Sequence, residues 1–286
     1  MSFAVAMLLI LTAGCSPRSV AEGLFLGDHF VRTADIAYAG GPRQRLDVYR
    51  PRAAPQPLPV VVFLYGGRWQ TGSKNEYRLI GGALTQHGLV VIVPDYRLYP
   101  DTIFPGWVED GARAVRWARD HAHRFGGDTA HIVVVGHSAG AHTAALLALN
   151  EAYLQRAGVP TGAVRGFVSL AGPVDTLWTD ADVQALMGPR QGWPATYPVT
   201  HLDGDEPPIL LLHGASDETV SPTNSVHLAK RIRAAGGCAR AELYPGVGHI
   251  KIVAALMVPS LRIAPVLEDV VSFVRDPRET TCPSIP

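Results

Sequence analysis

The chain has 286 residues, of which 47% are apolar and 17% are charged. This length and composition are enough for one large domain with a single hydrophobic core. Twenty-five basic residues balance 25 acidic ones and no basic block stands out, so the sequence gives no support for nucleic acid or an anionic membrane as an electrostatic partner.

The chain begins with an apolar stretch over residues 3–14 that is too short to span a membrane and ends in small residues. This is the pattern of a secretory signal. Cys15 follows directly, and residues 11–15 resemble a bacterial lipoprotein signal, in which the cysteine is lipidated and becomes the first mature residue. No Lys or Arg precedes the stretch, and Thr12 stands where that pattern prefers an aliphatic residue. The alternatives are a plain signal peptide or a misassigned start codon.

We therefore expect residues 1–15 to be a signal peptide with Cys15 as the candidate lipidation site, and residues 16–286 to form one folded domain. Its expected location is outside the cytoplasm, in a bacterial periplasm, attached to a membrane through a lipid on Cys15, or secreted.

Apolar runs and turn residues predict alternating strands and helices after this segment. Strands are expected at residues 30–39, 45–50, 60–65, 89–93, 131–135, 164–170, 208–212 and 239–244, and helices at 106–122, 141–149, 221–235 and 260–274. Because most of the strands are continuous apolar runs separated by helices, the sequence predicts an α/β fold with a mostly parallel sheet covered on both faces.

One stretch, residues 173–207, breaks this alternation with aromatic side chains among Pro, Gly and Asp. An insertion between strands at the carboxyl edge of a sheet is a common place for a small cap or pocket wall. We expect Trp178, Met187 and Trp193 to line a substrate pocket together with Trp69. The alternative is a surface crossover whose aromatic residues only pack.

The most informative motif is Gly136-His-Ser-Ala-Gly140, which lies between an apolar strand and a helix-forming run. A serine in this strand–turn–helix context is typical of a nucleophile elbow. The flanking glycines allow strand and helix to pass close to the hydroxyl. The sequence therefore predicts Ser138 as a covalent nucleophile.

A serine hydroxyl needs a base within hydrogen-bond reach, and the base needs an acid that orients it. In an elbow protein these partners follow in the order acid, then histidine. Asp217 comes after the apolar strand that ends at 212, and His249 comes after the next strand in a glycine-rich loop. We expect these two residues to complete a Ser-His-Asp triad.

Other titratable residues are weaker candidates for these roles. Glu218 is the nearest rival acid, and Asp205 and Glu206 are more distant ones. His137 is expected to pack at the elbow, and His213 is expected to support the acid loop.

The tetrahedral intermediate of acyl transfer needs N–H donors aimed at its oxyanion. The backbone N–H of Ala139, directly after the nucleophile, is one expected donor. Gly66 and Gly67 follow the predicted strand at 60–65 and are the others, because glycine lets backbone approach a substrate closely. The alternative is that this glycine pair only makes a tight turn.

Two cysteines remain after Cys15, at positions 238 and 282. An even pair in an exported protein predicts a disulfide between Cys238 and Cys282 that fixes the C-terminal tail. Two unrelated thiols are the alternative. No metal-ligand spacing is present, so we expect neither a metal nor another cofactor.

Taken together, these motifs resemble those of α/β-hydrolase carboxylesterases, of the hormone-sensitive-lipase-like type and especially the bifunctional feruloyl and acetyl-xylan esterase group. The segments that carry the resemblance are 65–69, 72–74, 95–98, 104–105, 109–110, 136–142, 213–217 and 248–249. The resemblance implies Ser138, Asp217 and His249 as triad, and Gly66, Gly67 and Ala139 as oxyanion hole.

The chain departs from the pattern at two positions: Tyr65 replaces the usual histidine, and Arg68 replaces the third glycine. These changes bear on substrate range more than on the type of reaction. We expect a serine esterase for short-chain or small aryl esters, with a small-molecule ester as its partner. The alternatives are a formamide hydrolase similar to kynurenine formamidases, and an inactive binding protein on the same fold.

Overall fold

The computed structural model describes residues 29–55, 57–175 and 177–282 and contains one sheet. Its strands are β1 (Phe30–Ala37), β2 (Arg45–Pro51), β3 (Leu58–Leu64), β4 (Val90–Pro94), β5 (Gly127–His137), β6 (Val164–Leu170), β7 (Ile209–Gly214) and β8 (Ala239–Tyr244). They are arranged in the order β1-β2-β4-β3-β5-β6-β7-β8. β2 is antiparallel to both β1 and β4, and the other neighbours are parallel. The predicted mostly parallel sheet is confirmed.

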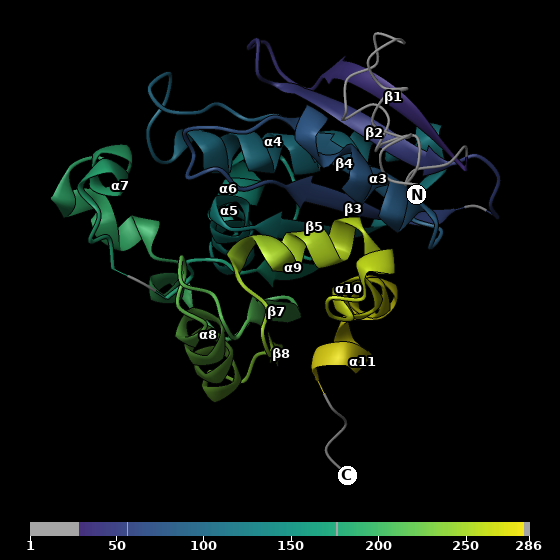
Figure 1. Ribbon diagram of the computed structural model, residues 1–286. Coiled ribbons are helices and arrows are strands. Elements are labelled where there is room, and N and C mark those ends of the chain that lie inside the picture. Colours follow the sequence, from purple (N-terminus) through teal and green to yellow (C-terminus); the bar gives the residue numbers. More distant parts are fainter. Residues whose placement is uncertain (1–28, 56, 176, 283–286) are drawn as a thin grey trace, which may run out of the picture.

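Helices cover both faces of this sheet (Figure 1). They are α3 (Arg78–Thr85), α4 (Gly106–His121), α5 (Ala139–Leu149), α6 (Ala152–Arg156), α7 (Ala181–Leu186), α8 (Thr223–Ala234), α9 (His249–Met257), α10 (Val266–Arg275) and α11 (Pro277–Thr281). Short 3-10 turns are η1 (Lys74–Tyr77), η2 (Ala122–Phe125), η3 (Arg190–Thr196), η4 (Pro198–His201) and η5 (Pro259–Leu261). α3, α9 and α10 contact one another, and α4 contacts α5 and α6 in a second group.

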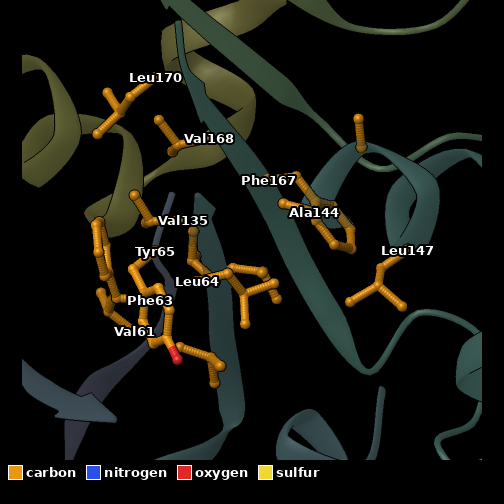
Figure 2. Close-up of a cluster of buried hydrophobic side chains, with 14 of the residues drawn as sticks. Val61, Phe63, Leu64, Tyr65, Val135, Ala144, Leu147, Phe167, Val168 and Leu170 are labelled. Carbon is orange, nitrogen blue, oxygen red and sulfur yellow. The ribbon is translucent and has the colours of Figure 1, made fainter. Parts of the chain in front are cut away.

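The core consists of side chains on both faces of the central strands. Phe63 of β3, Val135 of β5 and Val168 of β6 are register neighbours, and all three are buried on one face (Figure 2). Leu64 and Phe167 belong to the opposite face, near Leu147 of α5. Burial on both faces explains why these strands are continuous apolar runs in the sequence.

Several helices were not predicted from the sequence. α3 contains Gly81 and Gly82, which lower helix propensity. Gly81 is nevertheless required, because a Cβ there would lie 2.5 Å from the ring of Tyr49. The helix expected at 260–274 begins only at Val266, directly after Pro265, and η5 occupies part of the preceding segment.

The parallel strands end at the same edge of the sheet, so the loops that follow β3, β5, β7 and β8 meet there. The chain between β6 and β7 contains α7, η3 and η4, so the 173–207 insertion has helical structure of its own. This edge is where the predicted site residues lie.

Candidate active site

Ser138 lies in a sharp turn between β5 and α5. Its φ is 53° and its ψ is −119°, a strained conformation for a residue with a side chain. A Cβ on Gly136 would lie 2.3 Å from the carbonyl oxygen of Gly140, and one on Gly140 would lie 2.1 Å from that of Leu64. Only glycine fits on either side of the turn, which holds the Ser138 hydroxyl at the carboxyl edge of the sheet.

Two further side chains, from the loop after β7 and the start of α9, meet this hydroxyl. His249 Nε2 lies 2.8 Å from Ser138 Oγ, and His249 Nδ1 lies 2.8 Å from Asp217 Oδ2. The His249 side chain is 10% exposed and that of Asp217 is fully buried. The structure therefore brings Ser138, His249 and Asp217 into one chain of hydrogen bonds.

The Asp217 carboxylate is held by backbone as well as by the imidazole. Its Oδ1 accepts the N–H groups of Thr219 at 2.8 Å and Val220 at 2.9 Å. Burial on its own raises the pKa of Asp217, but the hydrogen bonds from Val220, His249 and Thr219 outweigh burial and lower the pKa below its usual value. Asp217 is therefore an anion at neutral pH, aimed at His249 Nδ1.

The rival acids lie elsewhere. Glu218 is exposed to solvent, and Asp205 and Glu206 precede β7 at the opposite edge of the sheet. Glu206 Oε1 accepts the N–H groups of Asp203 and Gly204, so it stabilises its own loop.

A second histidine contacts the Asp217 carboxylate. The side chain of His213 is fully buried, and its Nε2 lies 3.2 Å from Asp217 Oδ2 and 3.0 Å from the carbonyl oxygen of Val220. Its Nδ1 lies 2.8 Å from Ser225 Oγ. Burial lowers the pKa of His213, so the ring is neutral, with Nε2–H shared between Asp217 and Val220 and Nδ1 accepting from Ser225.

His137, beside Ser138, contacts the backbone of His249. Its Nε2 lies 3.1 Å from the carbonyl oxygen of His249, and the two rings are 5.1 Å apart. Burial, together with the neighbouring His249, lowers the pKa of His137 to about 4. Its neutral ring therefore donates Nε2–H to the backbone that carries His249.

The glycine loop after β3 lies against the elbow. A Cβ on Gly66 would lie 2.9 Å from Ser138 Cβ, and Gly67 has a φ of 122°. The backbone of Gly66 makes a hydrogen bond to the Tyr77 hydroxyl. Burial raises the pKa of Tyr77 to about 12, although this hydrogen bond lowers it. Within the described part of the chain, the N–H groups of Gly67 and Ala139 make no hydrogen bond.

Tyr65, which replaces the family histidine, fixes the start of this loop. Its hydroxyl donates to Asp95 Oδ1 at 2.7 Å and accepts from Arg43 at 2.9 Å. Its ring stacks on those of Tyr96 and Tyr77 at 4.6 and 5.3 Å. Burial raises the pKa of Tyr65 far above its usual value, so the hydroxyl stays protonated and keeps donating.

A cavity of about 230 Å³ opens beside Ser138. Of the four predicted pocket residues, Trp69 and Trp178 line it, together with Ala139 and Val183. Trp69 and Trp178 meet edge to face at 6.0 Å. The rest of its lining consists of Arg68, Pro173, Leu177, Thr179, Asp180, Thr219, Val220, Ser221 and Asn224.

The prediction for the other two pocket residues was wrong. Met187 is buried in the core and does not line the cavity. Trp193 also lies outside it: its indole N–H donates to the carbonyl oxygen of Gly188 at 3.0 Å, and Arg190 stacks on its ring. Both residues stabilise the insertion internally.

A buried contact joins the insertion to α5, the helix that follows Ser138. His142 of α5 is fully buried, and its Nε2 lies 2.8 Å from the carbonyl oxygen of Thr196. Thr196 Oγ1 accepts the Trp178 indole N–H at 2.6 Å. This arrangement, which the sequence did not predict, fixes Trp178 in the cavity wall.

Cys238 and Cys282 form a disulfide across 44 residues, which joins the start of β8 to the end of α11. Cys15 lies outside the described residues, so its lipidation stays a prediction. In the part of the chain that the structure describes, no helix is long and apolar enough to cross a bilayer, and no cluster of His, Cys, Asp or Glu is arranged to hold a metal.

The eight-stranded, mostly parallel sheet, with Ser138 in a sharp strand–helix turn at its carboxyl edge, defines an α/β-hydrolase fold. A family model described as BD-FAE matches residues 46–232, and the chain belongs to this family.

The chain is 26% identical over 252 residues to the probable isoprenylcysteine alpha-carbonyl methylesterase ICMEL1 of Arabidopsis thaliana, covering 75% of this chain and 50% of that protein. It is 30% identical over 245 residues to esterase LipC of Mycobacterium tuberculosis, covering 77% and 60%. It thus spans about half to three fifths of the length of these relatives. A truncated carbohydrate esterase from gut microbiota has the same fold, with a TM-score of 0.76 and 23% identity over 88% of this chain and 98% of that one.

Proposed function

We propose that this protein hydrolyses carboxylic esters through an acyl-enzyme, with Ser138 as nucleophile, His249 as base and Asp217 as orienting acid. The observation that carries the proposal is the unbroken hydrogen-bond chain from Ser138 Oγ through His249 to Asp217, with 2.8 Å at each step. Carboxylic ester hydrolases among the relatives support the same chemistry.

In the first half-reaction, Ser138 Oγ attacks the ester carbonyl and gives its proton to His249 Nε2. Asp217 holds Nδ1–H and stabilises the imidazolium. The N–H groups of Gly67 and Ala139 are the donors that we assign to the oxyanion, and each such donor is typically worth about 3 kcal/mol in the transition state. Gly66 then serves to let the loop pack against Ser138.

His249 next donates its proton to the leaving alcohol, which leaves an acyl group on Ser138. Water enters, gives a proton to Nε2 and attacks the acyl carbonyl, and collapse of the intermediate releases the acid and restores Ser138. A cavity of about 230 Å³ beside the nucleophile favours small acyl or aryl groups.

The test compares p-nitrophenyl acetate with N-formylkynurenine as substrates, together with labelling by a fluorophosphonate. We expect hydrolysis of the ester, a covalent adduct at Ser138, and a loss of at least about a thousandfold in rate for Ser138→Ala with normal folding. Clear preference for the formamide would replace the esterase by a formamidase. Absence of the adduct in folded protein would favour a binding protein.

We propose further that the mature protein is exported and carries a lipid on Cys15. The disulfide supports the first part, because such bonds persist in oxidising compartments. Labelling of the wild type with palmitate, and its loss in Cys15→Ser, tests the second. If the wild type is not labelled, the lipid on Cys15 is refuted and a plain signal peptide is the remaining interpretation.

A further inference from the structure

The cavity beside Ser138 carries a charge where the resembling esterases have a glycine. Arg68 follows Gly67, has a φ of 55°, and lines the cavity. Its guanidinium is half exposed. A cation at this place would ordinarily attract a substrate carboxylate, because Arg binds carboxylates through paired N–H groups.

Two acids of the insertion, Asp180 and Asp182, form ion pairs with this guanidinium. Arg68 Nη2 lies 2.7 Å from Asp182 Oδ2 and 3.3 Å from Asp180 Oδ2. Asp180 directly precedes α7 and lines the cavity, and Asp182 lies in the first turn of that helix. The hydrogen bond from Arg68 lowers the pKa of Asp182, so both partners stay charged at neutral pH.

The other residues that line the cavity are uncharged. Arg68, Asp180 and the neighbouring Asp182 therefore determine how the cavity interacts with a charged substrate. One positive and two negative groups leave the rim with a net negative charge. A substrate carboxylate would be repelled by Asp180 and Asp182, and it would find Arg68 Nη2 already paired with both of them.

We propose that Arg68, Asp180 and Asp182 form a charge filter at the cavity, which admits uncharged esters and rejects esters that carry a carboxylate. Arg68 is then a latent carboxylate-binding residue, and the two acids hold it in an inactive pairing. This inference rests on the proposed esterase function and adds the class of substrate to it.

The decisive variant is Asp180→Asn/Asp182→Asn, which frees Arg68 and removes both repulsive charges. The substrates are two pairs matched in size. In p-nitrophenyl butyrate and p-nitrophenyl hemisuccinate a methyl group is replaced by a carboxylate on the acyl side, and in 4-methylphenyl acetate and 4-acetoxybenzoate the same replacement is on the alcohol side. The measured quantity is the ratio of kcat/KM for the anionic ester to that for the neutral ester, corrected with a Ser138→Ala blank, so a general loss of activity cancels.

We expect the double variant to raise this ratio about tenfold for at least one pair, since half-exposed charge contacts are each worth a few tenths to about 1 kcal/mol. At 0.5 M NaCl the gain should shrink severalfold, because salt screens exposed charges. Arg68→Gln should lower the ratio. The triple variant Arg68→Gln/Asp180→Asn/Asp182→Asn should raise the ratio less than the double variant does, because it has no guanidinium to bind the carboxylate.

The matched control is Asp203→Asn/Asp205→Asn, which removes two exposed acids of the same insertion at the opposite edge of the sheet. A similar gain in this control, or the same gain in the triple variant as in the double variant, would show a general charge effect and overturn the filter. An unchanged ratio in the double variant would overturn it as well.

A binding measurement separates this inference from the esterase proposal. Trp69 and Trp178 line the cavity, so N-phenylbutanamide and N-phenylsuccinamate, which are uncharged and anionic amide analogues, can be titrated by tryptophan fluorescence. If no ester is hydrolysed by the wild type, the esterase proposal fails. Tighter binding of the anionic analogue to the double variant than to the wild type would still support the filter, and equal binding would refute it.

Discussion

The contact between His213 and the Asp217 carboxylate gives a sharp prediction about the pH dependence of the reaction. His213 Nε2 lies 3.2 Å from Asp217 Oδ2, the same oxygen that receives His249 Nδ1. Replacing His213 by leucine removes this N–H while keeping the buried position filled by a side chain. The negative charge of Asp217 is then shared among fewer donors, so it stabilises the protonated form of His249 more strongly.

The size of the effect follows from the geometry. Hydrogen bonds to charged groups are worth about 1.5–3 kcal/mol, and the lower value applies here because the N–H is also shared with Val220. About 1.4 kcal/mol is a factor of ten in rate or one pH unit. We expect His213→Leu to move the acid limb of the kcat/KM profile upward by up to about one pH unit. On the plateau above the shifted limb the variant should keep a rate within about tenfold of the wild type, because Asp217 still holds His249 Nδ1, whereas Ser138→Ala loses far more.

The assay is the pH profile of kcat/KM for p-nitrophenyl acetate, with the melting temperature as a check on folding. His213→Gln is the rescue variant, since its amide N–H reaches about as far as Nε2. Ser225→Ala removes only the outer hydrogen bond of His213 and tests the same arrangement if the leucine variant does not fold. If His213→Leu folds and its pH profile equals that of the wild type, the proposed effect of His213 on Asp217 is refuted. If only Ser225→Ala folds, a wild-type profile in that variant refutes it.

Three further results are expected. Burial lowers the pKa of His137 and His142 to about 4 from 6.5. As the pH falls from 6.5 to 4, the unfolded state takes up protons that the buried rings do not, and each ring reduces the free energy of unfolding by up to about 3 kcal/mol. The melting temperature should therefore drop over this range, and it should drop less steeply in His142→Gln. Cys282→Ser, which opens the 44-residue loop to Cys238, should cost up to about 4 kcal/mol in urea unfolding but leave kcat near wild type, because the bond lies at the far edge of the sheet. Tyr65→Phe, which loses two hydrogen bonds below the glycine loop, should lower kcat about tenfold with little change in KM; an unchanged kcat would show that stacking alone positions the loop.

The residues proposed for catalysis were predictable because each follows a local pattern. Ser138 and Asp217 come shortly after apolar strands, and His249 comes shortly after the partly polar strand β8, each through a turn that contains glycine. Parallel strands then bring these turns to one edge of the sheet, so local patterns and a single topological rule are enough to place all three.

The cavity wall was less predictable. The described residues of the 173–207 insertion include no strand or long helix whose period would indicate which side chains face inward. A large apolar residue there can either line a cavity or pack internally, and the sequence looks the same in both cases. This is why the sequence could not show that Trp178 lines the cavity while Met187 and Trp193 do not. For the same lack of a regular period, the sequence did not predict the pairing of Arg68 with two acids that lie more than a hundred residues away in the chain.

The spacing between acid and base depends on the register of the two last strands. His213 pairs with Leu243 and Gly214 with Tyr244, and the Ser216 N–H then donates to the Val247 carbonyl at 2.9 Å. A Cβ on Gly214 would lie 2.2 Å from that carbonyl, so the two loops interlock only because this residue is glycine. A slip of one residue would displace one loop by about 3.3 Å, more than a hydrogen bond tolerates. Every side chain of β7 is buried, so burial alone does not choose this register. The close fit of Gly214 against the Val247 carbonyl and the hydrogen bond from Ser216 do choose it, and these contacts therefore set the distance between Asp217 and His249.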